Sequence, residues 1–242
     1  MMKKNPYLSP NFSEKIRVSK NIKFIIIHYT GMQSEIESIK RLTDKKSKVS
    51  SHYLINRKGK ILKMVSDKRI AWHAGKSRWK NYKNLNNWSI GIELVNKGHN
   101  IGYQNYTNSQ ILSLINLCKN LKKKYKINSS NFLGHSDISP LRKIDPGEKF
   151  PWKKLSKFKL GKWYKTESLK KNFKDWKKLK PLFFKNLYKI GYRYFDLNRR
   201  VKNDKLVIKA FQRKYNPSNV SGVVDRKTLK ISCFLANQLI KT

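Results

Sequence analysis

Two histidines and one aspartate lie where they could bind a single metal ion. His28 follows the apolar segment 23–27, which is typical of a buried strand, and His135 follows a second short apolar segment. The carboxyl ends of strands in an open α/β sheet form the edge at which ligands bind. Asp145 lies ten residues after His135, in a proline-containing loop. Two imidazoles and a carboxylate match a catalytic zinc site, which keeps its fourth position for water.

A base and a cation that metal-dependent hydrolysis would use can be assigned to the same region. Glu93 lies on the predicted strand 89–95, where alternation turns it away from the more apolar face. It could accept a proton from a metal-activated water. Lys143, two residues before Asp145, could stabilise the oxyanion. Taken singly, each of these residues also fits a structural or solvent-exposed role, and only the complete set indicates a hydrolase.

The elements that must position these residues alternate between strands and helices. Ser34 with Glu37, and Thr107 with Gln110, have the spacing of helix-capping pairs. The first helix carries an apolar face and the second runs to about Tyr125. The expected strands lie at residues 23–27, 53–55, 61–65, 89–95 and near Phe132, and the apolar face of the first helix holds Ile36, Ile39 and Leu42. This order predicts an α/β fold in which helices flank a central sheet.

The chain is predicted to contain two domains. Residues 156–175 are rich in lysine and lack clear periodicity, which indicates a linker between a catalytic domain, residues 1–155, and a helical domain, residues 176–242. A domain of about 65 residues has a small core, so we expect this one to depend on a neighbour or a ligand for stability. Its three expected helices lie at residues 179–190, 204–215 and 225–240.

The composition favours acidic partners. The chain has 56 Lys and Arg residues against 14 Asp and Glu residues, and its net charge of +42 creates a field that attracts anions. A dedicated nucleic-acid partner is not expected, because the basic residues are spread along the chain without a known nucleic-acid-binding motif. Cell-wall peptides, which bear carboxylates, are acidic as well. No apolar run approaches the roughly 18 residues of a membrane helix. Cys118 and Cys233 lie on apolar helical stripes and are expected to be buried thiols.

Five segments resemble the type-2 N-acetylmuramoyl-L-alanine amidases, a family that also contains the peptidoglycan recognition fold. In the family's order they are FIIIHYT (24–30), VSSHYLI (49–55), AWHAG (71–75), SIGIELVN (89–96) and GHSDISPLRKIDPG (134–147). The last segment is highly specific, because it holds histidine, lysine and aspartate at the family's spacing. The resemblance implies a mixed central sheet flanked by helices. It also implies hydrolysis of the amide bond between N-acetylmuramic acid, or its anhydro form, and L-alanine of the peptidoglycan stem peptide, in cell-wall turnover and recycling.

Carried over position by position, the resemblance implies a role for each residue of the set. His28, His135 and Asp145 become the ligands of one Zn²⁺ per chain. Glu93 becomes the general base and Lys143 the oxyanion stabiliser. All five positions match the family's pattern.

Further residues of these segments are expected to border the substrate groove. They are Tyr29, His73 and Ala74. His52 and Trp72 are expected to pack within the fold instead, and His99, in a polar loop, is assigned no role.

The C-terminal segment resembles three-helix peptidoglycan-binding domains. The resemblance rests on LYKIGY (187–192), IKAFQRKYNP (208–217) and GVVDRKTLK (222–230), with Asp225 as the expected N-cap of the last helix. It implies peptidoglycan or muropeptides as partners. The same residues also serve helix packing, so they do not by themselves establish binding.

The sequence leaves two alternative functions and two cellular compartments to be considered. A non-catalytic peptidoglycan sensor and a basic nucleic-acid-binding protein are the alternatives, and the complete set of metal and catalytic residues argues against both. Ser77, Trp79 and the FPWKKL run from Phe150 are similar to the periplasmic AmiD type of amidase, which implies the cell envelope. The polar residues after Lys3 and Lys4 lack the features of an export signal, which favours the cytoplasm. No feature indicates an oligomeric state.

Overall fold

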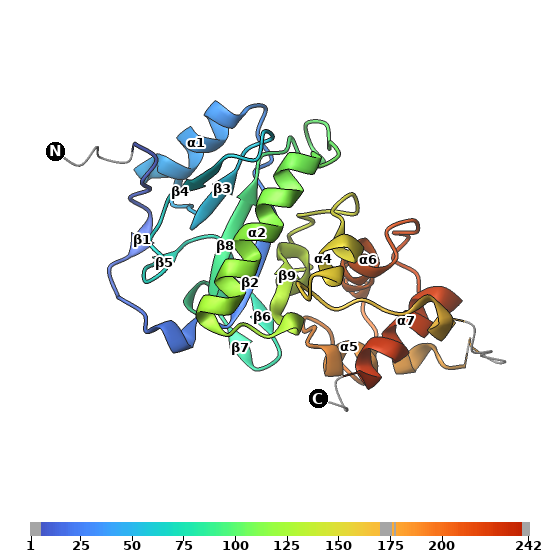
Figure 1. The fold of residues 1–242 in the computed structure, drawn as a ribbon. Coiled ribbons are helices and arrows are strands. Elements are labelled where there is room, and N and C mark those ends of the chain that lie inside the picture. The colour runs from blue at the N-terminus through green and yellow to red at the C-terminus, as the bar shows by residue number, and fades with distance from the viewer. Residues whose placement is uncertain (1–5, 170–175, 177, 239–242) are drawn as a thin grey trace.

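A five-stranded mixed sheet lies at the centre of the protein. The structure, a computed structural model, describes residues 6–169, 176 and 178–238. The strand order is β4-β3-β8-β2-β9 (Figure 1), with β3, β8, β2 and β9 parallel and β4 antiparallel at one edge. The strands are β2 (Phe24–Tyr29), β3 (Tyr53–Ile55), β4 (Ile61–Lys63), β8 (Ser89–Leu94) and β9 (Phe132–Gly134). The expected mixed α/β architecture is confirmed.

Two short antiparallel pairs and several single turns of 3₁₀ helix complete the irregular part of the fold. The pairs are β1 (Phe12–Ser13) with β5 (Ile70–Ala71), and β6 (Arg78–Trp79) with β7 (Tyr82–Lys83). The 3₁₀ turns are η1 (Ser19–Asn21), η2 (Lys45–Ser47), η3 (Leu85–Trp88), η4 (Ser129–Asn131) and η5 (Thr166–Leu169). The loop from β5 to β6 carries His73 and Ala74.

Helix α2 (Asn108–Tyr125) packs on one face of the sheet. Thr107 caps it as predicted, its hydroxyl accepting the N–H of Gln110 at 3.1 Å. Burying an isoleucine or leucine side chain contributes roughly 1.5–3 kcal/mol, so this face anchors strands β2 and β8. The apolar side chains between this helix and the sheet form one buried cluster, called the α2 cluster here. It includes Ile25 and Ile27 of β2, Ile90, Ile92 and Leu94 of β8, and Leu114 and Cys118 of α2.

The opposite face carries polar residues at the carboxyl ends of the strands and an apolar area at the amino ends. His28 and Glu93 are register partners on the adjacent parallel strands β2 and β8, so their side chains leave the sheet side by side. Earlier on β2, Phe24 and Ile26 point to the same face and are buried with Leu133 of β9. The candidate site and an apolar cluster therefore share one face.

Three C-terminal helices complete this apolar cluster. Phe183, Tyr192 and Phe211 belong to the same buried cluster as Phe24 and Ile26. The helices, on the β9 side of the sheet in Figure 1, are α5 (Lys180–Ile190), α6 (Asp204–Tyr215) and α7 (Arg226–Asn237). The first two match the expected ranges within one residue. The third was expected to reach Ile240, which lies outside the described residues.

The segment between the sheet and these helices is partly built into the core. Helix α4 (Trp152–Lys157) crosses the expected domain boundary at residue 155. Leu155 and Leu160 are fully buried in the α2 cluster, and Trp163 packs against both large clusters. Apolar side chains thus interrupt the lysine-rich stretch expected to be a linker, and they tie its first part to the sheet. Residues 170–175 of that stretch lie outside the described residues.

Helix α1 (Glu35–Thr43) begins as the sequence predicts but buries less than expected. The hydroxyl of Ser34 accepts the N–H of Glu37 at 3.1 Å. Ile39 and Leu42 join a small cluster on β3 and β4, whereas Ile36 is 78% exposed. The expected apolar face is therefore correct only for the C-terminal half of the helix, which is the half that contacts the sheet.

Both cysteines are free thiols. Cys118 is fully buried, and this burial raises its pKa far above the usual range. Cys233 is only partly buried, so the expected burial holds fully for the first cysteine alone. Within the part of the chain that the structure describes, no helix is both long and apolar enough to cross a bilayer.

Candidate functional site

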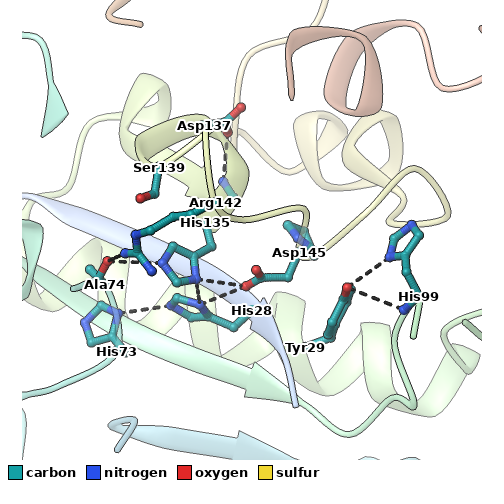
Figure 2. Close-up of polar contacts among 12 residues, drawn as sticks. His28, Tyr29, His73, Ala74, His99, His135, Asp137, Ser139, Arg142 and Asp145 are labelled. Carbon is teal, nitrogen blue, oxygen red and sulfur yellow. Dashed lines mark hydrogen bonds and ion pairs between the residues drawn. The ribbon is translucent and has the colours of Figure 1, made fainter. Parts of the chain in front are cut away.

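Three side chains bring donor atoms together at the carboxyl end of β2 (Figure 2). His28 Nδ1 lies 3.0 Å from His135 Nδ1, and each of these nitrogens lies 3.1 Å from Asp145 Oδ2. All three residues are buried. Zinc bonds of about 2.0–2.2 Å in tetrahedral geometry place two ligand atoms roughly 3.3 Å apart. The nearly equilateral triangle of donors could therefore hold a small divalent metal ion.

Hydrogen bonds behind His28 determine which of its ring nitrogens keeps a lone pair. Ser89 Oγ lies 2.5 Å from the carbonyl oxygen of Leu85 and must donate its only proton there. Ser89 Oγ therefore accepts from His73 Nε2 at 3.3 Å, and His73 Nδ1 accepts from His28 Nε2 at 3.0 Å. His28 Nδ1 is left unprotonated and directed at the metal position, as metal ligation requires.

A main-chain carbonyl sets the tautomer of His135 in the same way. His135 Nε2 donates to the carbonyl oxygen of Ala74 at 3.1 Å, which leaves Nδ1 free to bind a metal. Arg142 Nη2 donates to the same oxygen at 2.6 Å (Figure 2). Ala74, expected at the substrate groove, is fully buried and reaches the site through this carbonyl.

His73 lies directly behind His28, in the space that Gly91 of β8 leaves open because glycine has no side chain. The two imidazole rings meet edge to face with centroids 5.1 Å apart. A Cβ atom on Gly91 would lie 2.4 Å from His73 Cγ, so only glycine leaves room for this ring. Burial, and then the neighbouring His28, lower the pKa of His73 well below its ordinary value. His73 is therefore neutral, with the single proton that the hydrogen-bond chain uses.

The electrostatics of the three donors suit a cation. Burial alone would raise the pKa of Asp145, but the interactions with His135 and His28 outweigh it and hold this pKa far below the usual range. Burial, with His135 as the next contribution, lowers the pKa of His28 to about 4. A neutral imidazole and an ionised carboxylate are the forms that bind metal at neutral pH.

Glu93 presents an unsatisfied acceptor beside the donors. Its buried Oε2 atom has no hydrogen-bond partner among the residues that the structure describes. Burial, and then the charge of Asp145, raise the pKa of Glu93 to about 8, while Lys143 acts in the opposite direction. A carboxyl with a pKa near neutrality can take up and release a proton at the working pH, as a general base must.

An open cleft of about 490 Å³ lies over these residues. Arg41, Arg142 and Trp72 also line it, although the sequence analysis placed none of them at the site. Arg142 lies within the segment GHSDISPLRKIDPG, so its place in the sequence could have indicated that it lines the cleft. Nothing in the sequence around Arg41 gives such an indication. The expected site residues on the cleft wall are His28, Tyr29, His73, Glu93, His135, Lys143 and Asp145.

Tyr29 connects this cleft to a residue that the sequence left without a role. Its hydroxyl lies 2.9 Å from His99 Nδ1, and His99 Nε2 lies 3.1 Å from a carboxylate oxygen of Glu148 (Figure 2 shows the first contact). Burial, and then Asp145, raise the pKa of Tyr29 to about 12, so the phenol stays protonated. His52, by contrast, is buried and accepts the N–H of Gly91 at 3.0 Å, which agrees with the packing role expected for it.

A family model described as N-acetylmuramoyl-L-alanine amidase matches residues 18–148. The chain belongs to this family. The matched residues include the three donors as well as Glu93 and Lys143. They end before α4 and the C-terminal helices.

The sequence is similar to one amidase over most of the chain and to another over less than half of it. The chain is 34% identical over 226 residues to the N-acetylmuramoyl-L-alanine amidase AmiD of Escherichia coli, a match that covers 87% of this chain and 81% of AmiD. It is 42% identical over 108 residues to the 1,6-anhydro-N-acetylmuramyl-L-alanine amidase AmpD of Haemophilus influenzae. That second match covers 44% of this chain and 56% of AmpD.

Solved amidase structures match nearly the whole chain. E. coli AmiD in complex with the substrate anhydro-N-acetylmuramic acid-L-Ala-D-γ-Glu-L-Lys has a TM-score of 0.79 and 32% identity, and the match covers 90% of each chain. AmpDh3 of Pseudomonas aeruginosa in complex with anhydromuramic pentapeptide has a TM-score of 0.80 and 28% identity, covering 98% of this chain and 99% of AmpDh3. These matches include the C-terminal helices.

Proposed function

We propose that this protein is a zinc-dependent N-acetylmuramoyl-L-alanine amidase of the bacterial cell wall. It hydrolyses the amide bond between N-acetylmuramic acid, or its anhydro form, and L-alanine of the stem peptide. The observation that carries the proposal is the buried triangle of His28, His135 and Asp145 with Glu93 beside it in the sheet. The muropeptides bound by AmiD and AmpDh3 indicate the substrate class.

We assign one Zn²⁺ to the three buried donors. Two imidazole nitrogens and one carboxylate oxygen are a ligand set that zinc accepts at a catalytic site, and both lone pairs are oriented by hydrogen bonds to the opposite ring nitrogens. When bound, Zn²⁺ supplies a Lewis acid that polarises the scissile carbonyl and makes water acidic enough to attack near neutral pH.

The side chains of the cleft would manage protons and charge during this reaction. Glu93 accepts a proton from the attacking water and returns it to the nitrogen of the departing L-alanine. Lys143 places a positive charge near the oxygen on which negative charge develops. No covalent bond to the protein is needed, because water attacks the carbonyl directly.

The charge of the cleft fits a stem peptide. Arg41, Arg142 and Lys143 line the same cleft as the donors. Stem peptides carry carboxylates, which this positive wall would attract and orient. The same wall would contribute little to a neutral glycan alone, so we expect peptide-bearing fragments to be preferred.

A non-catalytic sensor is the second candidate. A protein that only binds muropeptides needs neither a base nor an oxyanion stabiliser. This chain retains Glu93 and Lys143 in the cleft, and Glu93 keeps a buried carboxylate oxygen without a partner among the described residues, which is unfavourable unless the atom is used. The catalytic role is therefore the better supported.

The test compares metal-loaded and chelator-treated protein. Each is incubated with purified peptidoglycan and with an anhydro-muramyl tripeptide, and the products are identified by mass spectrometry. We expect free stem peptide only from the metal-loaded protein, and at least ~100-fold less of it from Glu93→Gln, which keeps the metal. Binding of muropeptide without release of peptide, with or without Zn²⁺, would instead establish the sensor.

A further inference from the structure

Asp137 is a buried carboxylate two residues after the metal donor His135. It is 1% exposed and lies on the short helix α3 (His135–Ile138). One oxygen, Oδ2, accepts the N–H of Gly134 at 2.8 Å, which closes the turn that carries His135. The first turn of α3 also reaches Asp145, whose carbonyl oxygen accepts the N–H of Ser136 at 2.9 Å. The position of α3 therefore affects two of the three donors.

The two side chains that donate to the carboxylate of Asp137 both come from the C-terminal segment, and one of them is charged. Lys214 of α6 donates to Oδ2 at 2.7 Å, and the hydroxyl of Tyr192, just after α5, donates to Oδ1 at 2.5 Å. Lys214 is 3% exposed and Tyr192 is fully buried. Neither residue belongs to the segment matched by the amidase family model, which ends at residue 148.

Lys214 holds the chain on both sides of His135. Besides Asp137, its ammonium group donates to the carbonyl oxygen of Phe132 at 3.1 Å, at the start of β9. It also lies 4.2 Å from the centre of the Trp152 ring. Two of the three N–H groups of the ammonium therefore have oxygen acceptors, and its charge also faces an aromatic ring. The strand before His135 and the helix after it are thus joined through one side chain from α6.

From these contacts we infer that the C-terminal helices position the metal donors, and that Lys214 and Tyr192 act as positioning residues through Asp137. This inference rests on the proposed metal site and deepens it. It gives the C-terminal segment a role inside the amidase unit, separate from any binding of the cell wall. Groups that orient ligands from behind commonly change metal affinity 10–100-fold when they are removed.

If Lys214 and Tyr192 had a purely structural role, a different experimental result would be expected. If Lys214 and Tyr192 only dock the C-terminal helices, their loss should lower stability and leave the metal affinity of the folded protein unchanged. Phe183 offers the matched control, because it is fully buried in the same cluster and packs against Phe184 and Phe211. Phe183→Leu should lower stability without altering the charge or the hydrogen bonds of Asp137.

The experiment measures Zn²⁺ affinity of the full-length protein by competition with a chromogenic chelator, alongside urea denaturation of each variant. We expect the dissociation constant to rise about 10–100-fold in Lys214→Met and by a smaller factor in Tyr192→Phe. Phe183→Leu should keep the wild-type value. The visible absorption of the Co²⁺-substituted protein should shift in the first two variants only, because it reports ligand geometry.

Wild-type affinity and an unchanged Co²⁺ spectrum in folded Lys214→Met would overturn the inference. If Lys214→Met does not fold, Tyr192→Phe decides by the same two measurements, since it removes a single hydroxyl. Equal loss of affinity in Phe183→Leu would also overturn it, because general loosening would then explain the effect. A wild-type protein that takes up no Zn²⁺ would refute the metal site and the proposed function along with the inference.

Discussion

Replacing Glu93 by glutamine should stabilise the metal-free protein in a pH-dependent manner. Glutamine keeps the shape of the side chain but does not titrate. The burial that raises the pKa of Glu93 to about 8 makes its ionised form unfavourable in the folded state. In the unfolded chain the same carboxyl ionises near its ordinary value of 4.5. Folding of the wild type therefore becomes less favourable as the carboxyl is forced to ionise.

The size of the effect follows from proton linkage. Between pH 4.5 and about 8 the folded wild type binds one proton more than the unfolded chain at this group, so its free energy of unfolding falls as pH rises. The stabilising contribution is complete below pH 4.5 and is lost as pH passes through about 8. The slope within this window is about 1.4 kcal/mol per pH unit. Relative to wild type, Glu93→Gln should gain on the order of 2 kcal/mol between about pH 5.5 and 7.

Urea denaturation of both proteins in the presence of a chelator measures this difference. His28 and the other titrating groups are common to both proteins, so their contributions largely cancel when the two curves are subtracted. Added Zn²⁺ should flatten the difference, because a nearby divalent cation favours the ionised carboxylate. A difference that stays constant from pH 5.5 to 7 without metal would show that Glu93 is not held in an environment that disfavours its charge.

Three further substitutions test separate parts of the site. Asp145→Ala should abolish Zn²⁺ retention on dialysis, measured by elemental analysis, and undiminished metal content would remove it from the ligand set. Lys143→Met should keep its zinc but lower kcat by about 10²–10³, and an unchanged kcat would exclude an oxyanion role. Gly91→Ala should destabilise the fold by about 1–3 kcal/mol in urea, because the new methyl group would meet the ring of His73. Wild-type stability in that variant would mean that His73 can move aside freely.

Local signals in the sequence were enough to place most elements. The caps at Ser34, Thr107 and Asp225 all form the expected side-chain hydrogen bonds, since a cap depends only on residues two or three positions away. The gathering of His28 and Glu93 at one edge was also predictable, because parallel strands of a sheet present their carboxyl ends together.

Features that depend on distant segments could not be predicted in this way. Alternation and spacing do not reveal that His73 fills the space above Gly91, because the loop that carries His73 is placed by tertiary packing. The pairing of Asp137 with Lys214 spans 77 residues and involves two ordinary-looking charges in a chain rich in lysine. Ile36 lies on helix α1, which was predicted correctly, but its side chain is exposed. Only Ile39 and Leu42, later in the same helix, pack against the sheet.

The hydrogen-bond chains behind the two histidine donors both end on main-chain carbonyl oxygens, those of Leu85 and Ala74. A peptide carbonyl has no proton to donate and does not ionise in the physiological range. Each series of hydrogen bonds can therefore donate in one direction only, from the imidazole toward the carbonyl. In the neutral imidazoles, the lone pairs on Nδ1 of His28 and His135 are therefore oriented by the backbone path. Little rotational freedom of the imidazoles remains to be lost on metal binding, because folding has already restricted it.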